Sequence, residues 1–278
     1  MTAVRLLLLV LALLVVLVTT SAAARARAQS RPIALTAVGD IAMAPSSDGG
    51  AGFFRGVRSA LQGDVVLGNL EGTLTTGGAS KCSISSSNCF AFRAPPAYAR
   101  VLRRAGFTIM NLANNHALDY GSTGERQTIS ALDRVGLRHT GRPGEIAYLR
   151  VGRTRIAVLG FAPYRWAQSL VDISAAVRLV RKAAARTDIV VVTMHAGAEG
   201  APYEHVRPGT ETFLGENRGN AYAFSHAVVE AGADLVVGSG PHVLRGMEWY
   251  RGRLIAYSVG NFLGNGTLAF SEIGRAHV

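Results

Sequence analysis

The chain has 278 residues, of which 49% are hydrophobic and 17% charged, so it can bury a sizeable core, and the composition argues against extended disorder. Its formal net charge of +11 rests almost wholly on arginine, because Lys81 and Lys182 are the only lysines. The arginines are scattered and form no basic run with interleaved aromatic residues, which argues against nucleic acid as a partner. The basic excess suits an acidic polymer or an anionic membrane surface, although the codon bias of a GC-rich genome is the simpler explanation.

The N-terminus has the pattern of a targeting segment. Arg5 precedes an unbroken apolar run from Leu6 to Val18, and Ser21-Ala22-Ala23-Ala24 supplies small residues for cleavage. The apolar run is shorter than the ~20 residues that a membrane-spanning helix needs. We therefore expect residues 1–28 to be a signal peptide, with an uncleaved N-terminal anchor as the alternative. In both cases the folded part is exported and lies in the periplasm, in the cell envelope or outside the cell.

Export determines how the two cysteines are interpreted. Cys82 and Cys89 are close in sequence and enclose a serine-rich stretch. Outside the cytoplasm such a pair predicts a disulfide that pins a surface loop. A metal site built on two thiolates is the alternative, but no second cysteine pair supports it.

After the leader, β-rich apolar runs alternate with helical patterns. Strands are predicted at residues 33–38, 64–70, 107–112, 145–149, 155–161, 189–194, 234–238 and 254–259. Helices are predicted at residues 97–105, 122–135, 174–186 and 222–231; the second begins with capping-box spacing from Ser122 to Glu125. Glycine repeatedly separates a helix from the next strand, as in βα units. We therefore predict one α/β domain over residues 31–271, with a largely parallel sheet covered by helices on both faces.

Polar residues that can bind metal recur just beyond the carboxyl ends of five predicted strands. They are Asp40, Glu71, Asn114, Asn115, His116, His195 and His242. Ligands of open α/β sheets bind at this edge. Carboxylate, amide oxygen and imidazole together suit a divalent ion such as Mn, Fe or Zn, whereas a Ca or Mg cage would use more oxygen. One or two ions are expected, and a pair about 3.5–4 Å apart would clamp a phosphoryl group.

Six motifs occur in order over nearly all of the chain after the leader: Val-Gly-Asp40, Gly-Asn-Leu-Glu71, Asn111-Leu-Ala-Asn-Asn-His116 with Asp119 and Gly121, His195-Ala-Gly, Gly-Ala-Asp234 through Pro-His242-Val, and Tyr257-Ser-Val-Gly-Asn-Phe262. In these motifs the chain resembles the CapA family of bacterial capsule-synthesis proteins, which are linked to poly-γ-glutamate. The resemblance implies a calcineurin-like metallophosphatase fold, in which largely parallel central sheets are flanked by helices.

The resemblance also implies roles for single residues. The implied metal ligands are Asp40, Glu71, Asn115, His195 and His242, and the implied general acid is His116. Candidates that would orient these groups or face the substrate are Asn69, Asn114, Asp119, Glu199, Glu248 and Asn261, while Arg93 and Arg245 are either receptors for an anionic substrate or solvated arginines. Two positions depart from the pattern, because Gly240 and Ala42 stand where many relatives or the wider superfamily have histidine. A full two-metal site would then need other ligands.

The leading functional hypothesis is a metal-dependent phosphoesterase-type hydrolase in the biosynthesis of a capsule polysaccharide or polyglutamate. One alternative is a non-catalytic assembly factor that binds a nascent anionic polymer at the membrane. Another keeps the metal site but hydrolyses γ-glutamyl amide bonds. Residues 272–278 are interpreted as an artefactual tail, so that a last strand of the fold is expected to be missing.

Overall fold

The computed structural model describes residues 32–82 and 89–264, so the predicted leader and the predicted tail lie outside the described residues. Contacts divide the chain into Met1–Pro32 and Ile33–Val278, and every described helix and strand belongs to the second unit. Among the described residues, no helix has the length and apolar character of a membrane span.

The first sheet has five strands that all run parallel. Their order is β15 (Asn261–Gly264), β1 (Leu35–Ala42), β2 (Val65–Leu70), β5 (Ile109–Asn111) and β6 (Arg138–Thr140). All six residues of β2 are buried, as expected for a central strand that is covered on both faces.

The second sheet has six strands, of which the inner four are parallel and the two at the edges antiparallel to their neighbours. The order is β13 (Met247–Tyr250), β14 (Arg253–Ala256), β12 (Leu235–Ser239), β9 (Ile189–His195), β8 (Thr154–Phe161) and β7 (Ala147–Val151). Two small ribbons complete the strands: β3 (Thr73–Leu74) with β4 (Arg93–Ala94), and the hairpin β10 (Glu211–Phe213) with β11 (Glu216–Gly219).

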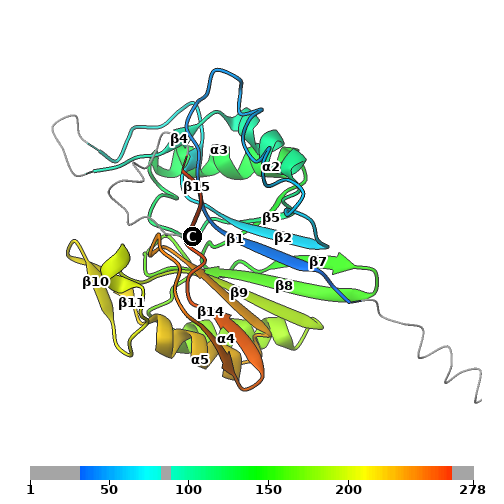
Figure 1. The fold of residues 1–278 in the computed structure, drawn as a ribbon, viewed down its shortest axis with the longest axis vertical. Helices are drawn as coiled ribbons and strands as arrows, with labels where there is room; N and C mark the ends of the chain where they lie inside the picture. Colours follow the sequence, from blue (N-terminus) through cyan, green and yellow to red (C-terminus); the bar gives the residue numbers. More distant parts are fainter. Residues whose placement is uncertain (1–31, 83–88, 265–278) are drawn as a thin grey trace, which may run out of the picture. The chain divides into compact units, whose positions relative to one another are not determined.

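The helices cover only the outer face of each sheet. On the first sheet lie η1 (Pro96–Tyr98), α2 (Ala99–Ala105) and α3 (Gly121–Arg134); on the second lie α4 (Ile173–Ala184) and α5 (Ala221–Glu230), as Figure 1 shows. A further 3-10 turn, η2 (Ala201–Tyr203), follows β9. The inner faces of the two sheets pack against each other through a separate apolar cluster that includes Val65, Ile109, Val158 and Val191.

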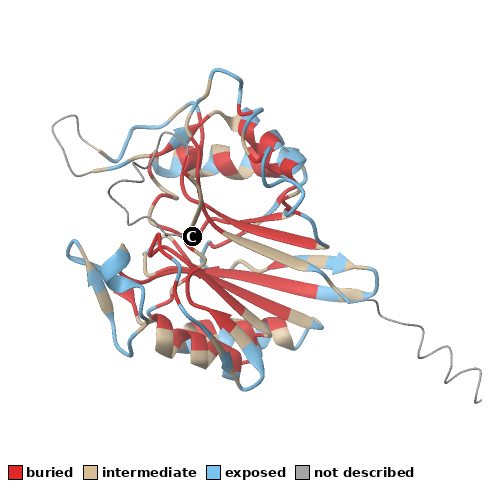
Figure 2. Cartoon of the chain, in the orientation of Figure 1, coloured by how far each residue is buried: buried red, intermediate tan, exposed pale blue. Residues whose placement is uncertain are grey.

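The predicted fold class, an α/β fold with largely parallel sheets flanked by helices, is confirmed. The expectation of a single sheet with helices on both faces is wrong, because two sheets share the central core. A continuous apolar run shows that a strand is buried on both faces, but the same run fits a helix or a second sheet as the covering layer. In Figure 2 the buried residues accordingly fill the strands and the inward faces of the helices.

Each predicted helix and strand is present, with bounds shifted by a few residues. Gly106 ends α2 in the left-handed conformation, with φ of 117°, which fits its predicted place after a helix. The capping box from Ser122 to Glu125 is not formed. The preceding turn, closed by a hydrogen bond from Gly121 N to Leu118 O, starts α3 one residue earlier, and Tyr120 at the N-cap makes no side-chain cap hydrogen bond.

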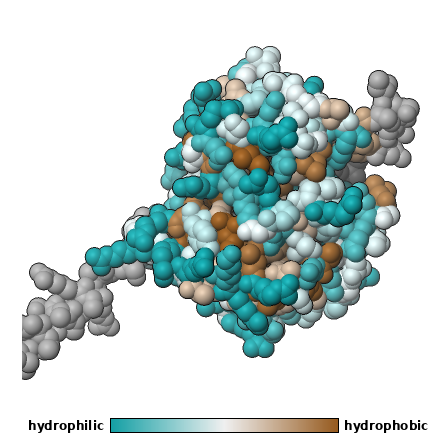
Figure 3. Space-filling view, turned by 180° about the vertical axis from the view of Figure 1, so that it is seen from behind, coloured by the Kyte–Doolittle hydropathy of each residue, from teal (hydrophilic) through white to brown (hydrophobic). Residues whose placement is uncertain are grey.

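The predicted disulfide between Cys82 and Cys89 is formed. On the face seen in Figure 3, hydrophobic residues emerge only in small groups between hydrophilic ones.

Candidate metal centre

The carboxyl ends of the strands bring the predicted residues of both sheets to one place. Asp40 of β1 pairs in register with Asn69 of β2, which in turn pairs with Asn111 at the end of β5. In the second sheet, His195 ends β9 and pairs with Ser239 at the end of β12. Glu71 and His242 follow β2 and β12 within a few residues. The parallel direction of these strands is therefore what assembles the site.

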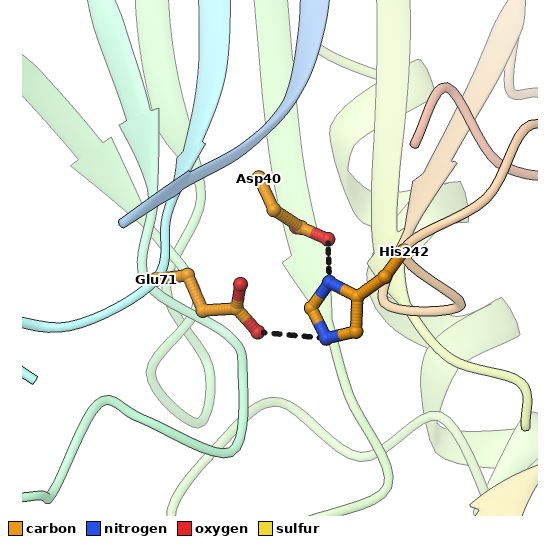
Figure 4. A group of neighbouring side chains, drawn as sticks. All are labelled: Asp40, Glu71 and His242. Carbon is orange, nitrogen blue, oxygen red and sulfur yellow. Dashed lines mark ion pairs between the residues drawn. The ribbon is translucent and has the colours of Figure 1, made fainter. Parts of the chain in front are cut away.

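Asp40, Glu71 and His242 form its centre. Each offers a ligand atom, and these atoms lie within 4.8 Å of one another in a buried environment. Figure 4 shows the His242 ring between the two carboxylates, with one nitrogen directed at each. Its Nδ1 is 3.3 Å from Asp40 Oδ2, and its Nε2 is 3.6 Å from Glu71 Oε1. His195 also approaches both carboxylates, with Nδ1 3.6 Å from Asp40 Oδ1 and Nε2 3.6 Å from Glu71 Oε1.

Asn69 is the centre of the hydrogen-bond network behind these ligands. Its Nδ2 donates to Asp40 Oδ1 at 2.7 Å and lies 3.1 Å from His195 Nδ1. Its Oδ1 accepts from Asn111 Nδ2 at 2.8 Å and from Asn114 Nδ2 at 3.1 Å. Every hydrogen-bonding group of this buried amide is therefore engaged, which fixes the orientation of Asp40. Asn114 thus supports the site from behind and is not directed at it as a ligand.

The donor set fits a divalent cation by a direct criterion, the lack of partners for buried polar atoms. Both carboxylate oxygens of Glu71, Asn115 Oδ1 and His195 Nε2 are buried without a hydrogen-bond partner among the described residues. Leaving a buried polar atom unpaired costs about 1–3 kcal/mol, and more for charged groups. All of these atoms belong to residues that the sequence predicts as metal ligands, and a cation held by Asp40, Glu71 and His242 would satisfy the oxygens of Glu71.

The pKa values of the ionisable groups at the centre also fit a bound divalent cation. Burial raises the pKa of Glu71 to about 8, and the charge of Asp40 acts in the same direction. Burial lowers the pKa of His195 to about 4, against the attraction of Asp40. Burial also opposes the charged form of His242, but the carboxylates of Glu71 and Asp40 outweigh it and raise its pKa to about 10. Without a metal, the proton on Glu71 and the positive charge on His242 thus compensate the buried carboxylate of Asp40, and a divalent ion would supply that compensation in their place.

Residues around His242 hold its ring. Asn261 Oδ1 accepts from Nδ1 at 2.7 Å, which leaves Nε2 to face Glu71 and, at 3.8 Å, Glu199. His242 also has φ of 58°, a left-handed conformation that is uncommon outside glycine and often found at functional sites. Asn261 and Glu199 therefore both lie beside His242.

His116 forms a pair with Asp119 next to the metal ligands. Its Nδ1 is 2.8 Å from Asp119 Oδ2, and its ring stacks on Phe92 with centroids 4.2 Å apart. Lys81, which sequence reasoning missed, contacts Asp119 Oδ1 at 2.7 Å and the carbonyl of Asn115 at 3.2 Å. Burial lowers the pKa of His116, although Asp119 opposes the shift. The acidic partner fixes which nitrogen carries the proton and leaves Nε2 to exchange one.

One candidate does not belong to the centre. Glu248 lies on β13, whose antiparallel pairing with β14 directs it toward α5, where it contacts His226 at 3.0 Å and accepts from Tyr257 at 2.7 Å. The prediction that Glu248 orients a ligand or faces the substrate is therefore wrong. Motif position alone does not tell which face of an edge strand a residue occupies.

Two arginines have structural roles that the sequence did not indicate. Arg218, only 1% exposed, donates to the carbonyls of Gly197 and Gly240 and contacts Glu199 at 3.0 Å. It thereby ties together the loops that carry His195 and His242. Arg245 is held by Glu211 through two contacts of 2.7–2.8 Å, so it does not present a free charge to a substrate.

Structural explanations also exist for Arg93, the other arginine considered as a substrate receptor, and for Gly240, which stands where many relatives have histidine. Arg93 lies over the ring of Tyr120, 4.6 Å from its centroid. Gly240 has φ of 105°, and a Cβ there would lie 3.0 Å from Ala196 N and 3.1 Å from His195 Cδ2. Its backbone N–H donates to Asp40 Oδ2 at 3.1 Å. The loop is therefore built around glycine, and a histidine would not fit this backbone without a shift.

Comparison with known proteins gives the family. The family described as "Bacterial capsule synthesis protein PGA_cap" matches residues 34–266. The chain belongs to this family. The capsule biosynthesis protein CapA of Bacillus anthracis is 33% identical over 185 residues, which cover 59% of this chain and 42% of that protein. The PGA biosynthesis protein CapA of Bacillus subtilis is 33% identical over 181 residues, covering 59% of this chain and 44% of the relative. This chain therefore spans less than half the length of either relative.

A solved structure supports the fold. A protein named as a putative 5'-nucleotidase from Staphylococcus aureus, in complex with alpha-ketoglutarate, superposes with a TM-score of 0.53 at 17% identity. The match covers 82% of this PGA_cap chain and 48% of the other protein. At this identity the likeness shows a shared fold and no more. Together with the family match, it confirms the resemblance to CapA proteins with a metallophosphatase-like fold.

Proposed function

We propose that this chain is a metal-dependent hydrolase of the metallophosphoesterase type that acts, outside the cytoplasm, on a capsule polymer or on its precursors. The observation that carries the proposal is the buried group of Asp40, Glu71 and His242 together with the unpartnered carboxylate oxygens of Glu71 and the unpartnered Nε2 of His195 beside it. The His116–Asp119 pair lies in the same loop system as Asn115, one of the residues with such an atom. The names of the CapA relatives support a role in capsule polymer synthesis.

In the proposed centre, the cation would be held by Asp40, Glu71, Asn115, His195 and His242. A bound divalent ion would supply a Lewis acid that polarises a phosphoryl or carbonyl oxygen. Asn69 and Asn261 would hold the carboxylate of Asp40 and the ring of His242 in place. Asp119 would keep the proton on Nδ1 of His116, so that Nε2 transfers a proton to or from the bound substrate.

A metal-supplemented activity screen tests the proposal. The purified protein with added Mn is expected to hydrolyse a chromogenic phosphodiester or monoester, and His116→Asn is expected to lower kcat by about 10²–10⁴-fold, as loss of an acid–base group does. Bound metal, measured by mass spectrometry, should be unchanged, because His116 is not a proposed ligand. His226→Asn is the matched control, since His226 pairs with Glu248 away from the centre. Undiminished activity of His116→Asn would remove its proposed role.

The same screen includes γ-glutamyl polymer, because a hydrolase of that amide bond would use the same groups. Turnover of the polymer without turnover of phosphoesters would replace the proposed reaction class. Tight polymer binding with no bound metal and no turnover would instead favour an assembly factor, the alternative that the substitutions Gly240 and Ala42 suggest. Export is tested separately by fractionating cells that express the full chain.

A further inference from the structure

A second polar site lies at the opposite edge of the two sheets. An open cavity of about 520 Å³ is lined there by five arginines from separate segments, Arg103, Arg138, Arg150, Arg155 and Arg186. No aspartate or glutamate is among its lining residues. Arg138 is the first residue of β6 and Arg155 the second of β8, so the cavity lies at the amino ends of the strands. The candidate metal centre lies at their carboxyl ends, and the two sites are therefore distinct.

The arrangement of these arginines is electrostatically unfavourable in the absence of an anion. Arg150 and Arg155 are register partners on the antiparallel strands β7 and β8, so their side chains lie on the same face. Like charges directly opposite each other destabilise a strand pair. Asp188 compensates the charge of Arg155 through two hydrogen bonds: Nη2 donates to Oδ1 at 2.8 Å, and Nε donates to Oδ2 at 3.2 Å.

The other guanidinium groups of the cavity wall lack such a partner. Arg138 and Arg186 make no side-chain hydrogen bond or ion pair with any residue that the structure describes. Arg150 makes no ion pair within contact distance there, although its charge acts on Asp188 at longer range and helps to lower the pKa of that carboxyl. All three are exposed. Arg155 binds the carboxylate of Asp188 through two hydrogen bonds, which is the geometry that a guanidinium group favours. A carboxylate can therefore be bound in this way at the cavity wall.

We propose that this cavity binds a flexible anionic chain that carries carboxylates, with successive carboxylates paired to Arg138, Arg150 and Arg186. Several charges on separate segments suit a ligand whose anionic groups are spaced along a chain better than one compact anion. Tyr148, 42% exposed, and the half-buried Leu149 add apolar wall, against which the methylene groups of such a chain pack.

The cavity lacks the backbone and hydroxyl donors that are typical of phosphate sites, while its arginines can bind either anion. Phosphate sites commonly use the N–H groups of a helix N-terminus or a glycine-rich loop, together with hydroxyl groups. Here no lining residue belongs to the first turn of a described helix. The two hydroxyls are engaged elsewhere, because Thr108 bonds to the backbone of Val66 and Thr187 donates to the carbonyl of Ala183. Arginine side chains are thus the principal donors.

This binding site goes beyond the proposed hydrolase, and it does not require that the metal centre be catalytic. If the capsule polymer is itself a chain of carboxylates, the cavity would hold one part of the polymer while another part reaches the opposite edge. The binding test below uses no turnover, so its failure is distinguishable from failure of the hydrolase proposal.

Binding is measured by fluorescence anisotropy with a labelled oligoglutamate on the full chain at low salt. The double variant Arg138→Gln/Arg150→Gln is expected to weaken binding at least about tenfold, through loss of two charge-assisted contacts. Arg126→Gln/Arg178→Gln removes the same charge from exposed positions on α3 and α4 and should change the affinity less than about twofold, since distant surface charges are screened. Thermal unfolding confirms that both variants fold.

Three results would overturn the proposal. Wild-type protein that shows no saturable binding lacks the site. Equal weakening in both double variants would mean that net charge, and not this cavity, attracts the probe. Displacement of the probe by polyphosphate or inorganic phosphate at lower concentration than by unlabelled oligoglutamate would assign the cavity to phosphate instead.

Discussion

The substitution Asn69→Asp tests whether the amide at the heart of the centre keeps it stable without metal. In the protein, Asn69 Nδ2 donates to Asp40 Oδ1 at 2.7 Å, and both residues are buried. Aspartate has nearly the same shape but replaces that N–H donor with a second anionic oxygen. The contacts from Asn111 and Asn114 to the other oxygen would survive. The variant therefore changes the contacts of one atom, Nδ2: it replaces the hydrogen bond to Asp40 by a carboxylate pair and places an anionic oxygen beside His195 Nδ1.

The expected cost follows from two physical effects. A hydrogen bond to a charged group contributes about 1.5–3 kcal/mol, and this contribution is lost. The two carboxylates cannot both stay ionised at contact distance, so one of them takes up a proton. Each unit by which the pKa of that group exceeds its ordinary value, up to the pH of the experiment, lowers the free energy of unfolding by about 1.4 kcal/mol. We expect the free energy of unfolding of the metal-free variant to fall by about 3–5 kcal/mol. A divalent cation should reverse much of this loss, because the new carboxylate is an additional ligand.

The measurement is urea unfolding of both proteins in EDTA and in excess Mn, at neutral pH. Asn217→Asp is the control, since Asn217 is exposed and its Oδ1 accepts from Gly219 N, which a carboxylate does equally well. A metal-free Asn69→Asp protein as stable as the wild type would refute the assigned role of Asn69. A loss that Mn does not reduce would refute the placement of the cation beside Asp40.

Three further outcomes are expected. Lys81→Gln should raise the pKa of His116, because the charge of Lys81 lowers it. An unchanged midpoint of the His116 titration, followed by NMR, would contradict this effect of Lys81 on His116. Cys82→Ser/Cys89→Ser should lower the free energy of unfolding by about 2 kcal/mol, the effect of opening a short loop, and reductant should affect only the wild type. In EDTA, Glu71 should make stability fall as the pH rises from 4.5 toward 8, by at most about 1.4 kcal/mol per pH unit for this group, since the folded state holds a proton that the unfolded state has lost. The lowered pKa of His195 acts in the opposite direction below 6.5, so the effect is measured as the difference between the wild type and Glu71→Gln, which should lack the downward contribution.

The part of the site that depends on strand direction could be predicted from the sequence. Asp40, Glu71 and His195 each follow an apolar run, and parallel strands deliver their carboxyl ends to one edge. That argument needs no knowledge of which strands are neighbours. It therefore survives the change from one predicted sheet to two, because the carboxyl ends of both sheets meet at the same centre.

The part that depends on long-range packing could not be predicted. Arg218 lies in a short hairpin and is one arginine among many in the sequence, yet folding buries it between two loops far apart in the chain. Glu248 occupies a motif position, but the pairing of an edge strand decides the face on which it lies. Such short strands, β6 and β15 among them, are determined by their partners and carry little periodic signal of their own.

Gly240 shows why the number of histidines missing from the family pattern does not decide whether this centre binds metal. From the sequence alone, glycine in that position removes an imidazole and weakens the case for metal. In the structure the same residue brings its backbone N–H to Asp40 Oδ2 and its carbonyl to Arg218, in a conformation that favours glycine. Glycine thus allows the backbone conformation in which this N–H reaches and orients Asp40. The electrostatic demand for a cation comes from Asp40 and Glu71, and that demand does not depend on residue 240.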